Sequence, residues 1–219
     1  MDTWRDRGDT LVKLYVEGGG DAAILKTECR KGFSEFIKKF GISKMPRVVA
    51  CGGRQNAYES YRTAIDNGEE AFLLVDAEDP IDSAHQEGDP INWKPWAHLN
   101  SRNGDKWEKP SDANDTDCHL MAQVMESWFV ADRLKLKQFY GTDFKVSKLP
   151  LEGTPIESIV KKSIYSSLSE ATKTCRSKGQ YGKGSHSFKI LSEIDPDKVV
   201  DASPWAKRFL IELRKRMDT

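Results

Sequence analysis

The first 78 residues contain three short apolar runs separated by two amphipathic stretches. The runs at residues 11–17, 48–51 and 71–75 are rich in apolar side chains and end at turn residues or acids, which predicts strands. Residues 22–40 repeat apolar side chains with a helical period, and residues 55–65 predict a second helix. Connections of this length imply a parallel sheet with helices on both faces. The pattern therefore predicts an α/β fold with a Rossmann-like parallel sheet.

Residues 79–115 show no periodic pattern. They contain four prolines and three tryptophans, the latter being Trp93, Trp96 and Trp107. A segment of this length without secondary structure is uncommon in a compact domain and is usually a functional loop or an insertion. Because the tryptophans suggest that the segment packs onto something, we expect an ordered insertion that completes an α/β core over residues 1–115.

The second half of the chain predicts helices. The clearest is expected over residues 117–135, with others near residues 156–167 and 204–217. Proline and glycine interrupt the pattern between them. We therefore expect residues 116–219 to form a helical extension that packs on the core.

A polar stripe marks the helix expected over residues 117–135. His119, Gln123 and Glu126 are spaced i, i+4 and i+7, which places them on one helical face among apolar side chains. Buried polar groups need partners. Glu126 is compatible with two roles, a carboxylate that completes a catalytic site and a member of a structural hydrogen-bond network. His119 is likewise compatible with a catalytic base or a structural hydrogen-bonding group.

Composition places the protein among charged, water-soluble chains. Of its 219 residues 31% are charged, and the mean hydropathy is −0.62. No apolar run approaches the roughly 20 residues of a membrane helix, and the N-terminus lacks a signal pattern. The four cysteines form no C-x-x-C pair, which argues against a zinc finger and a disulfide framework. We expect a cytoplasmic protein that does not enter a membrane.

The formal net charge is zero, so binding to nucleic acid would depend on local patches. Residues 161–189 provide one, with seven basic residues, a single acid and interleaved aromatic side chains. Such a patch suits nucleic-acid binding, and Lys183 and Lys189 are candidates for contacting a phosphate and stabilising its charge. An ordinary solvated surface is the alternative.

Carboxylates follow two of the predicted strands. The residues are Glu17 and Asp21 around the first strand end, and Asp76 and Glu78 at the third. Functional groups of parallel sheets gather at the carboxyl ends of strands, and carboxylates are ligands that Mg²⁺ prefers. A glycine turn lies between the first two acids, at Gly18, Gly19 and Gly20, and lets the backbone approach a phosphate. The pattern indicates a phosphotransfer site, although solvated acids at strand ends are the simpler interpretation.

A dinucleotide site is a third interpretation. Residues 18–23 match G-x-G-x-x-A after a strand. However, Glu17 and Asp21 would place negative charge beside a pyrophosphate, and residues 51–53 lack the acid expected at the second strand end. A P-loop is excluded because no Gly-Lys-Ser/Thr follows the turn.

The same residues carry a resemblance to a known fold family. Residues 16–21 resemble the V-E-G-x-x-D signature of TOPRIM domains, and residues 74–78 resemble their D-x-D strand. This fold is shared by topoisomerases, bacterial primases and OLD-type nucleases. Residues 119–132 resemble a prokaryotic TOPRIM-like family of unknown function whose members often occur beside ABC-type ATPases.

The resemblance implies a metal-dependent nuclease in phage defence or DNA processing. It implies Mg²⁺ or Mn²⁺ at Glu17, Asp21, Asp76 and Glu78, where Glu78 replaces the usual aspartate. Catalytic roles are expected for Glu17, Asp76, Glu78, Glu126 and Lys189, and phosphate contacts for Gly18, Gly19, Gly20, Lys183 and Lys189. The expected partners are nucleic acid and an ABC-type ATPase, and a homo-oligomer is compatible with the sequence. A non-catalytic subunit that docks and regulates the ATPase is the alternative function.

Overall fold

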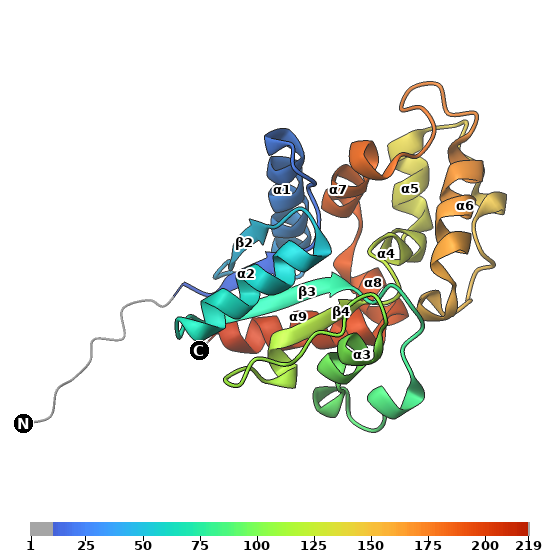
Figure 1. The fold of residues 1–219 in the computed structure, drawn as a ribbon. Coiled ribbons are helices and arrows are strands. Elements are labelled where there is room, and N and C mark those ends of the chain that lie inside the picture. Colours follow the sequence, from blue (N-terminus) through green and yellow to red (C-terminus); the bar gives the residue numbers. More distant parts are fainter. Residues whose placement is uncertain (1–10, 219) are drawn as a thin grey trace, which may run out of the picture.

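A four-stranded parallel sheet forms the centre of the protein (Figure 1). The computed structural model describes residues 11–218. The strands are β1 (Lys13–Val16), β2 (Arg47–Ala50), β3 (Ala71–Asp76) and β4 (Cys118–Met121). Their order across the sheet is β2-β1-β3-β4, and every neighbouring pair is parallel. The predicted α/β class, with a parallel sheet flanked by helices, is confirmed.

The helices of the described chain lie between and after these strands. They are α1 (Ala23–Lys39), α2 (Arg54–Asp66), α3 (Pro95–Ser101), α4 (Glu126–Ala131), α5 (Arg133–Tyr140), α6 (Lys161–Thr172), α7 (Lys183–Glu193), α8 (Pro196–Ala202) and α9 (Pro204–Met217). The expected bounds of α1, α2 and α9 agree with the structure within one residue. Helix α6 begins later than expected because a 3₁₀ turn at Ile156–Ser158 follows Pro155. None of these helices combines the length and apolar character needed to cross a membrane.

The prediction of a single helix over residues 117–135 is wrong. Cys118–Met121 forms β4, which pairs with β3 in the register Leu73 to Cys118 and Asp76 to Met121. A short apolar run suits a buried strand and a buried helix equally, and here pairing with β3 decides the outcome. Helix α4 begins only at Glu126, and Asp132 then caps α5 by accepting a hydrogen bond from Lys135 N. The sheet therefore takes its fourth strand from beyond residue 115.

The polar stripe expected on that helix consequently does not exist. His119 lies on β4, Gln123 lies in the connection after it, and Glu126 is the first residue of α4. Gln123 accepts a hydrogen bond from Lys161 N at the start of α6 (3.2 Å). The three side chains therefore serve three different parts of the structure.

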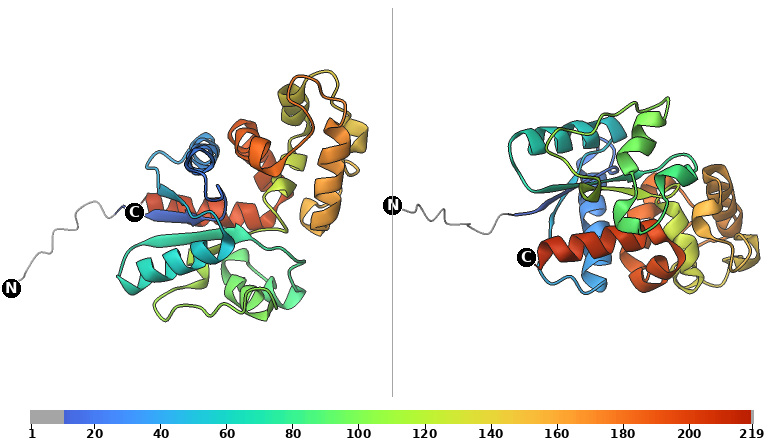
Figure 2. Two further views of the ribbon diagram at one scale, coloured as in Figure 1. Left: turned by 45° about the horizontal axis from the view of Figure 1, so that its top comes forward. Right: turned by 90° about the horizontal axis from the view of Figure 1, so that it is seen from below.

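Helices lie on both faces of the sheet (Figure 2), and each face buries a separate apolar cluster. Alternate strand residues point to opposite faces, as the strand period of two requires. One cluster contains Leu14, Val16, Phe72 and Leu74 with Phe33 of α1, Trp128 of α4 and Phe209 of α9. The other contains Tyr15, Leu73 and Val75 with Tyr58 and Tyr61 of α2 and Trp96 of α3. Packing of helices on both faces of the sheet thus holds the strands, and with them the strand ends, in place.

Residues 79–115, the segment expected to be an insertion, pack onto the rest of the protein through their tryptophans. Trp93, Trp96 and Trp107 are all buried. Trp107 stacks on Tyr58 of α2 with ring centroids 4.7 Å apart, and Trp93 contacts Trp205 of α9 at 4.6 Å. The insertion therefore packs against the α2 face of the sheet and against α9.

The four cysteines are free and buried, in agreement with the expectation that they form no disulfide framework. Burial raises the pKa of the Cys29 thiol to about 12, so this side chain stays protonated and packs as a small apolar group.

Candidate metal centre

The carboxyl ends of β1 and β3 meet because these strands are neighbours in the sheet. One carboxylate oxygen from each of Glu17, Asp76 and Glu78 lies within 4.8 Å of the other two. Glu17 N donates to Leu74 O (3.3 Å), which continues the pairing of the two strands up to the cluster. Three of the four predicted metal ligands therefore converge.

Glu17 is held through one of its two carboxylate oxygens. Its Oε2 accepts hydrogen bonds from Arg54 Nη1 (3.2 Å) and from the backbone N of Asp76 (3.3 Å). Burial raises the pKa of the Glu17 carboxyl, while the nearby Arg54 guanidinium opposes this shift. The side chain is thus fixed in direction and favours binding a proton or a cation.

Asp76 is the most deeply buried member of the cluster, with 3% of its surface exposed. Its Oδ1 accepts a hydrogen bond from Met125 N (2.7 Å), and Lys183 Nζ lies 3.7 Å from its Oδ2. Burial raises the pKa of this carboxyl well above its usual range, and the charges of Glu17 and Glu126 raise it further. An added cation would relieve this electrostatic cost.

Glu78 adopts a backbone conformation that side-chain-bearing residues rarely take, with a φ of +68°. Its N donates to Gln123 O (2.7 Å), so the connection after β4 holds this turn in place. Its carboxylate forms an ion pair with Lys161. Such strain persists only where surrounding contacts fix it, and it is common at functional sites.

Two other predicted residues do not join the cluster. Asp21 is exposed and lies outside the converging group, so its role as a ligand stays a prediction. Lys189 forms an ion pair with Glu28 of α1, with Nζ and Oε1 3.4 Å apart, instead of with an acid of the cluster. Among the described residues, no ion pair joins Lys189 to the acid cluster, so its catalytic and phosphate-binding roles stay predictions.

The glycine turn after β1 is locked against the turn after β2. Gly18 and Gly52 exchange two backbone hydrogen bonds of 2.9 and 2.8 Å. Gly18, Gly19 and Gly20 all have positive φ values. A Cβ atom on Gly52 would lie 2.7 Å from Gly20 O, and a Cβ on Gly18 would lie 2.8 Å from the Phe188 ring. Glycine is therefore required by backbone shape and by close approach.

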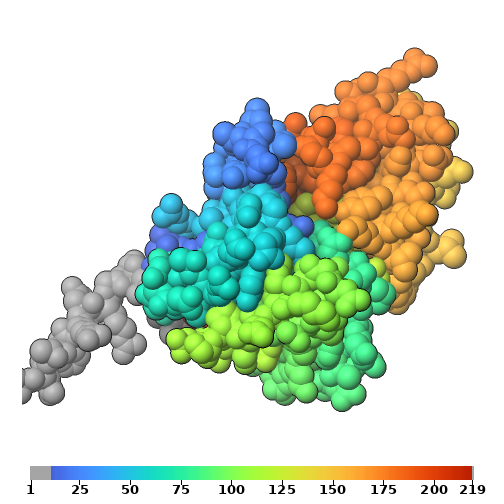
Figure 3. All heavy atoms as spheres, viewed as in Figure 1, coloured from blue at the N-terminus to red at the C-terminus, as the bar shows by residue number. Residues whose placement is uncertain are grey.

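A cavity of about 310 Å³ opens beside these residues. Its polar lining includes Glu17, Asp76, Glu126 and Lys183, and its apolar lining includes Leu25, Met121, Met125 and Phe188. Helices α1 and α7 pack against each other here, and Figure 3 shows the surface of α1 beside that of the segment containing α7. Acids, a cation and apolar surface thus border one space.

Glu126 is fully buried at one side of this cavity. It accepts hydrogen bonds from the hydroxyls of Tyr181 (2.8 Å), Ser187 (3.2 Å) and Tyr165 (3.3 Å). Lys183 Nζ donates to the Tyr165 hydroxyl (3.0 Å). Burial alone would lower the pKa of Lys183, but Glu126 and Asp76 raise it above its ordinary value, so this lysine is a permanent positive charge.

Sequence reasoning did not identify Arg54, Tyr165, Tyr181 or Ser187 as site residues. Arg54 had a usable signal, because it follows the Gly-Gly turn after β2 and therefore starts a helix at the same sheet edge as Glu17. No sequence signal marked Tyr165, Tyr181 and Ser187, because they approach Glu126 from segments 39 to 61 residues further along the chain.

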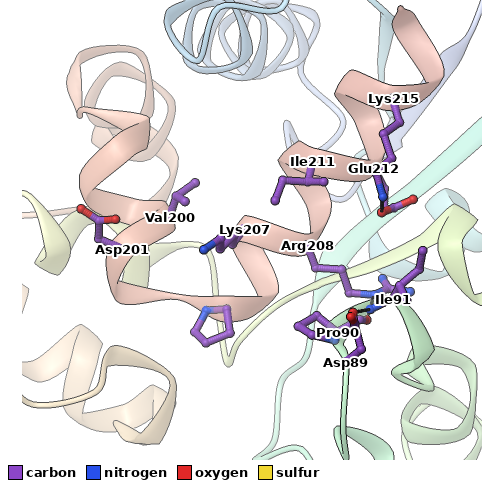
Figure 4. Close-up of a pocket in the computed structure, with 11 residues that line it drawn as sticks. Asp89, Pro90, Ile91, Val200, Asp201, Lys207, Arg208, Ile211, Glu212 and Lys215 are labelled. Atoms are coloured by element: carbon purple, nitrogen blue, oxygen red, sulfur yellow. Dashed lines mark hydrogen bonds and ion pairs between the residues drawn. The ribbon is translucent and has the colours of Figure 1, made fainter. Parts of the chain in front are cut away.

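A second groove, of about 600 Å³, lies between α9 and residues 89–91 (Figure 4). There the Arg208 guanidinium donates to the carbonyls of Pro90 (2.7 Å), Cys118 (2.9 Å) and Asp115 (2.7 Å). It also lies 3.0 Å from His119 Nδ1. Burial lowers the pKa of His119 well below its usual value, and Arg208 lowers it further, so the imidazole is neutral. Arg208 and His119 thus join α9 to β4 and the insertion.

The fold and the strand-end cluster define an α/β protein with a candidate divalent-metal centre. Over residues 16–214 the chain matches the family described as "Domain of unknown function (DUF4276)", and it belongs to that family. Comparisons with curated proteins and with solved structures returned no match.

Proposed function

We propose that this protein is a metal-dependent nuclease of the TOPRIM type, which hydrolyses phosphodiester bonds of DNA or RNA. The observation that carries the proposal is the convergence of the Glu17, Asp76 and Glu78 carboxylates at adjacent strand ends. The V-E-G-x-x-D and D-x-D resemblances supply the same three residues.

The donor set fits Mg²⁺ or Mn²⁺, because both prefer carboxylate oxygens. Glu17, Asp76 and Glu78 would hold the ion. When bound, the ion would neutralise phosphate charge and favour the attack of water on phosphorus. The burial of Asp76 among like charges supports the fit, since a cation offsets the cost of keeping these carboxylates ionised.

The residues around the acids have separate roles in the proposal. Lys183 offers a fixed positive charge at the cavity, where it can bind the phosphate and stabilise its developing charge. The glycine turn allows the substrate backbone to approach closely. The apolar wall formed by Leu25, Met125 and Phe188 suits a sugar or a base.

A hollow of about 500 Å³ is lined by Glu78 together with Lys161, Lys162 and Tyr165 among others. A nucleic-acid strand bound across the acids could therefore meet these lysines as well as Lys183 at the cavity.

We propose that the protein acts in the cytoplasm, within a phage-defence or DNA-processing system that includes an ABC-type ATPase. The family resemblance motivates that context.

Cleavage assays test the proposal. Purified protein, alone and with the ATPase encoded beside it, is incubated with end-labelled single- and double-stranded DNA and RNA. Cleavage is expected with Mg²⁺ or Mn²⁺ and is expected to stop when EDTA removes the metal. If no substrate is cut under any of these conditions while the protein remains folded, the proposed activity is wrong.

A groove with exposed leucines among charged residues favours a second candidate function, a non-catalytic subunit that docks on the ATPase. The groove measures about 870 Å³ and includes Leu134 and Leu151, whose exposed fractions are 56% and 84%. Exposed apolar surface of this kind often marks a protein interface. The double substitution Asp76→Ala, Glu78→Ala separates the two functions. A docking subunit that carries it is expected to keep its function in cells. An enzyme is expected to lose its function in cells while it still binds the partner.

A further inference from the structure

The insertion at residues 79–115 reaches the acid cluster through one arginine. Arg54, the first residue of α2, donates from Nη1 to Glu17 Oε2 (3.2 Å) and to the backbone carbonyl of Asp76. Its Nε and Nη2 donate to the two carboxylate oxygens of Asp105 in the insertion, at 2.8 and 2.7 Å. The guanidinium therefore bridges the insertion and the strand ends.

The insertion fixes this guanidinium on further sides. Arg102 pairs with Asp105 and also with Asp79 (2.8 Å). The Trp107 ring lies under the Arg54 guanidinium at 4.8 Å, and Tyr58 stacks behind that ring. Trp107 Nε1 donates to Gln55 Oε1 (2.9 Å), which ties the ring to α2. A bidentate ion pair and a stacked aromatic ring together leave Arg54 little freedom.

The contact at Glu17 has a chemical consequence. Two donors hold Oε2, one from Arg54 and one from the backbone of Asp76. Among the contacts of the described residues, Oε1 accepts no hydrogen bond. Fixing one oxygen sets the plane of the carboxylate and leaves the other oxygen for a cation, which is how residues behind metal ligands commonly act.

We propose that Arg54 is a positioning residue for Glu17, and that Asp105 and Trp107 of the insertion fix Arg54 for this task. The inference rests on the proposed function and deepens it by giving the insertion a role at the metal centre. A purely structural Arg54, which only joins α2 to the insertion, is the competing account.

Three substitutions separate the accounts. Arg54→Lys keeps the charge but cannot bridge Asp105 and Glu17 with a planar fork. Asp105→Asn keeps the shape of the acid but weakens its hold on Arg54. Arg62→Lys is the matched control, because Arg62 lies on the same helix and stacks on Tyr58 at 5.7 Å.

Mn²⁺ affinity of the full chain, measured by calorimetry, is the first readout. Arg54→Lys and Asp105→Asn are expected to weaken it about 10- to 100-fold, the usual effect of losing a partner of a metal ligand. Arg62→Lys is expected to bind as the wild type does. In a Glu17→Gln background, Arg54→Lys is expected to have no further effect. Unchanged affinity in Arg54→Lys, or independent effects of the two substitutions, would overturn the proposal.

Carbon-13 spectra of glutamate carboxylates in metal-free protein give the second readout, with the Glu17 signal assigned through Glu17→Gln. Arg54→Lys and Asp105→Asn are expected to shift or broaden this signal, and Arg62→Lys is not. An unmoved signal contradicts the positioning role. If wild-type protein binds no Mn²⁺, the nuclease proposal fails, while these spectra still decide whether Arg54 holds Glu17.

Discussion

Replacing Asp76 with asparagine is expected to remove nuclease activity while leaving the metal-free protein at least as stable as the wild type. Asp76 is buried beside Glu17 and Glu126, and its ionised form carries a desolvation cost. Asparagine keeps the oxygen that accepts from Met125 N but removes the charge. The charge thus opposes folding and serves metal binding.

Cleavage rates, Mn²⁺ affinity and thermal unfolding of Asp76→Asn measure both halves of this prediction. Activity should fall at least about 100-fold, because partners behind metal ligands alone contribute about 10- to 100-fold. Asp21→Asn is the control, since Asp21 is exposed and outside the converging group. Asp76→Asn with normal activity would contradict the account, and a large loss in Asp21→Asn would add that residue to the site.

Replacing Glu126 with glutamine is expected to destabilise the protein. Three hydroxyl groups donate to this buried carboxylate, and hydrogen bonds to charged groups contribute about 1.5–3 kcal/mol each. The amide group of glutamine would face some of these hydroxyls with a donor. We expect a loss of about 1–3 kcal/mol in the free energy of unfolding.

Urea unfolding at constant pH measures the stability change in Glu126→Gln. Glu28→Gln is the control, because it removes the partner of Lys189 from a half-exposed ion pair between α1 and α7, where about 0–1 kcal/mol is expected. If Glu126→Gln instead kept full stability and lost Mn²⁺ binding, Glu126 would be a metal ligand and not a support for α7 and Lys183.

The sequence allowed the first three strands, α1, α2 and α9 to be predicted, because the helices show a helical period and the strands are short apolar runs that end at turn residues or acids. It did not allow β4 to be predicted. All four residues of Cys118–Met121 are buried, as are those of β3, but here the polar spacing from His119 to Glu126 imitates a helix. Only the pairing with β3, about 45 residues earlier in the chain, distinguishes the two.

In the candidate site, too, some residues could be predicted from the sequence and others could not. Glu17, Asp76 and Glu78 could be predicted because parallel strands place their carboxyl ends at one edge. The partners of these acids could not, apart from the position of Arg54 after a glycine turn. Lys161 reaches Glu78 from 83 residues away, and Tyr181 reaches Glu126 from 55. Such contacts depend on how α6 and α7 pack, which local patterns do not specify.

Anomalous diffraction from crystals soaked in Mn²⁺ tests the central claim most directly. The account predicts a manganese peak within coordinating distance of the carboxylate oxygens of Glu17, Asp76 and Glu78, and its loss in Asp76→Asn crystals. Well-ordered carboxylates without a peak at saturating Mn²⁺, still paired with Arg54, Lys183 and Lys161, would show an ion-pair network and contradict the account.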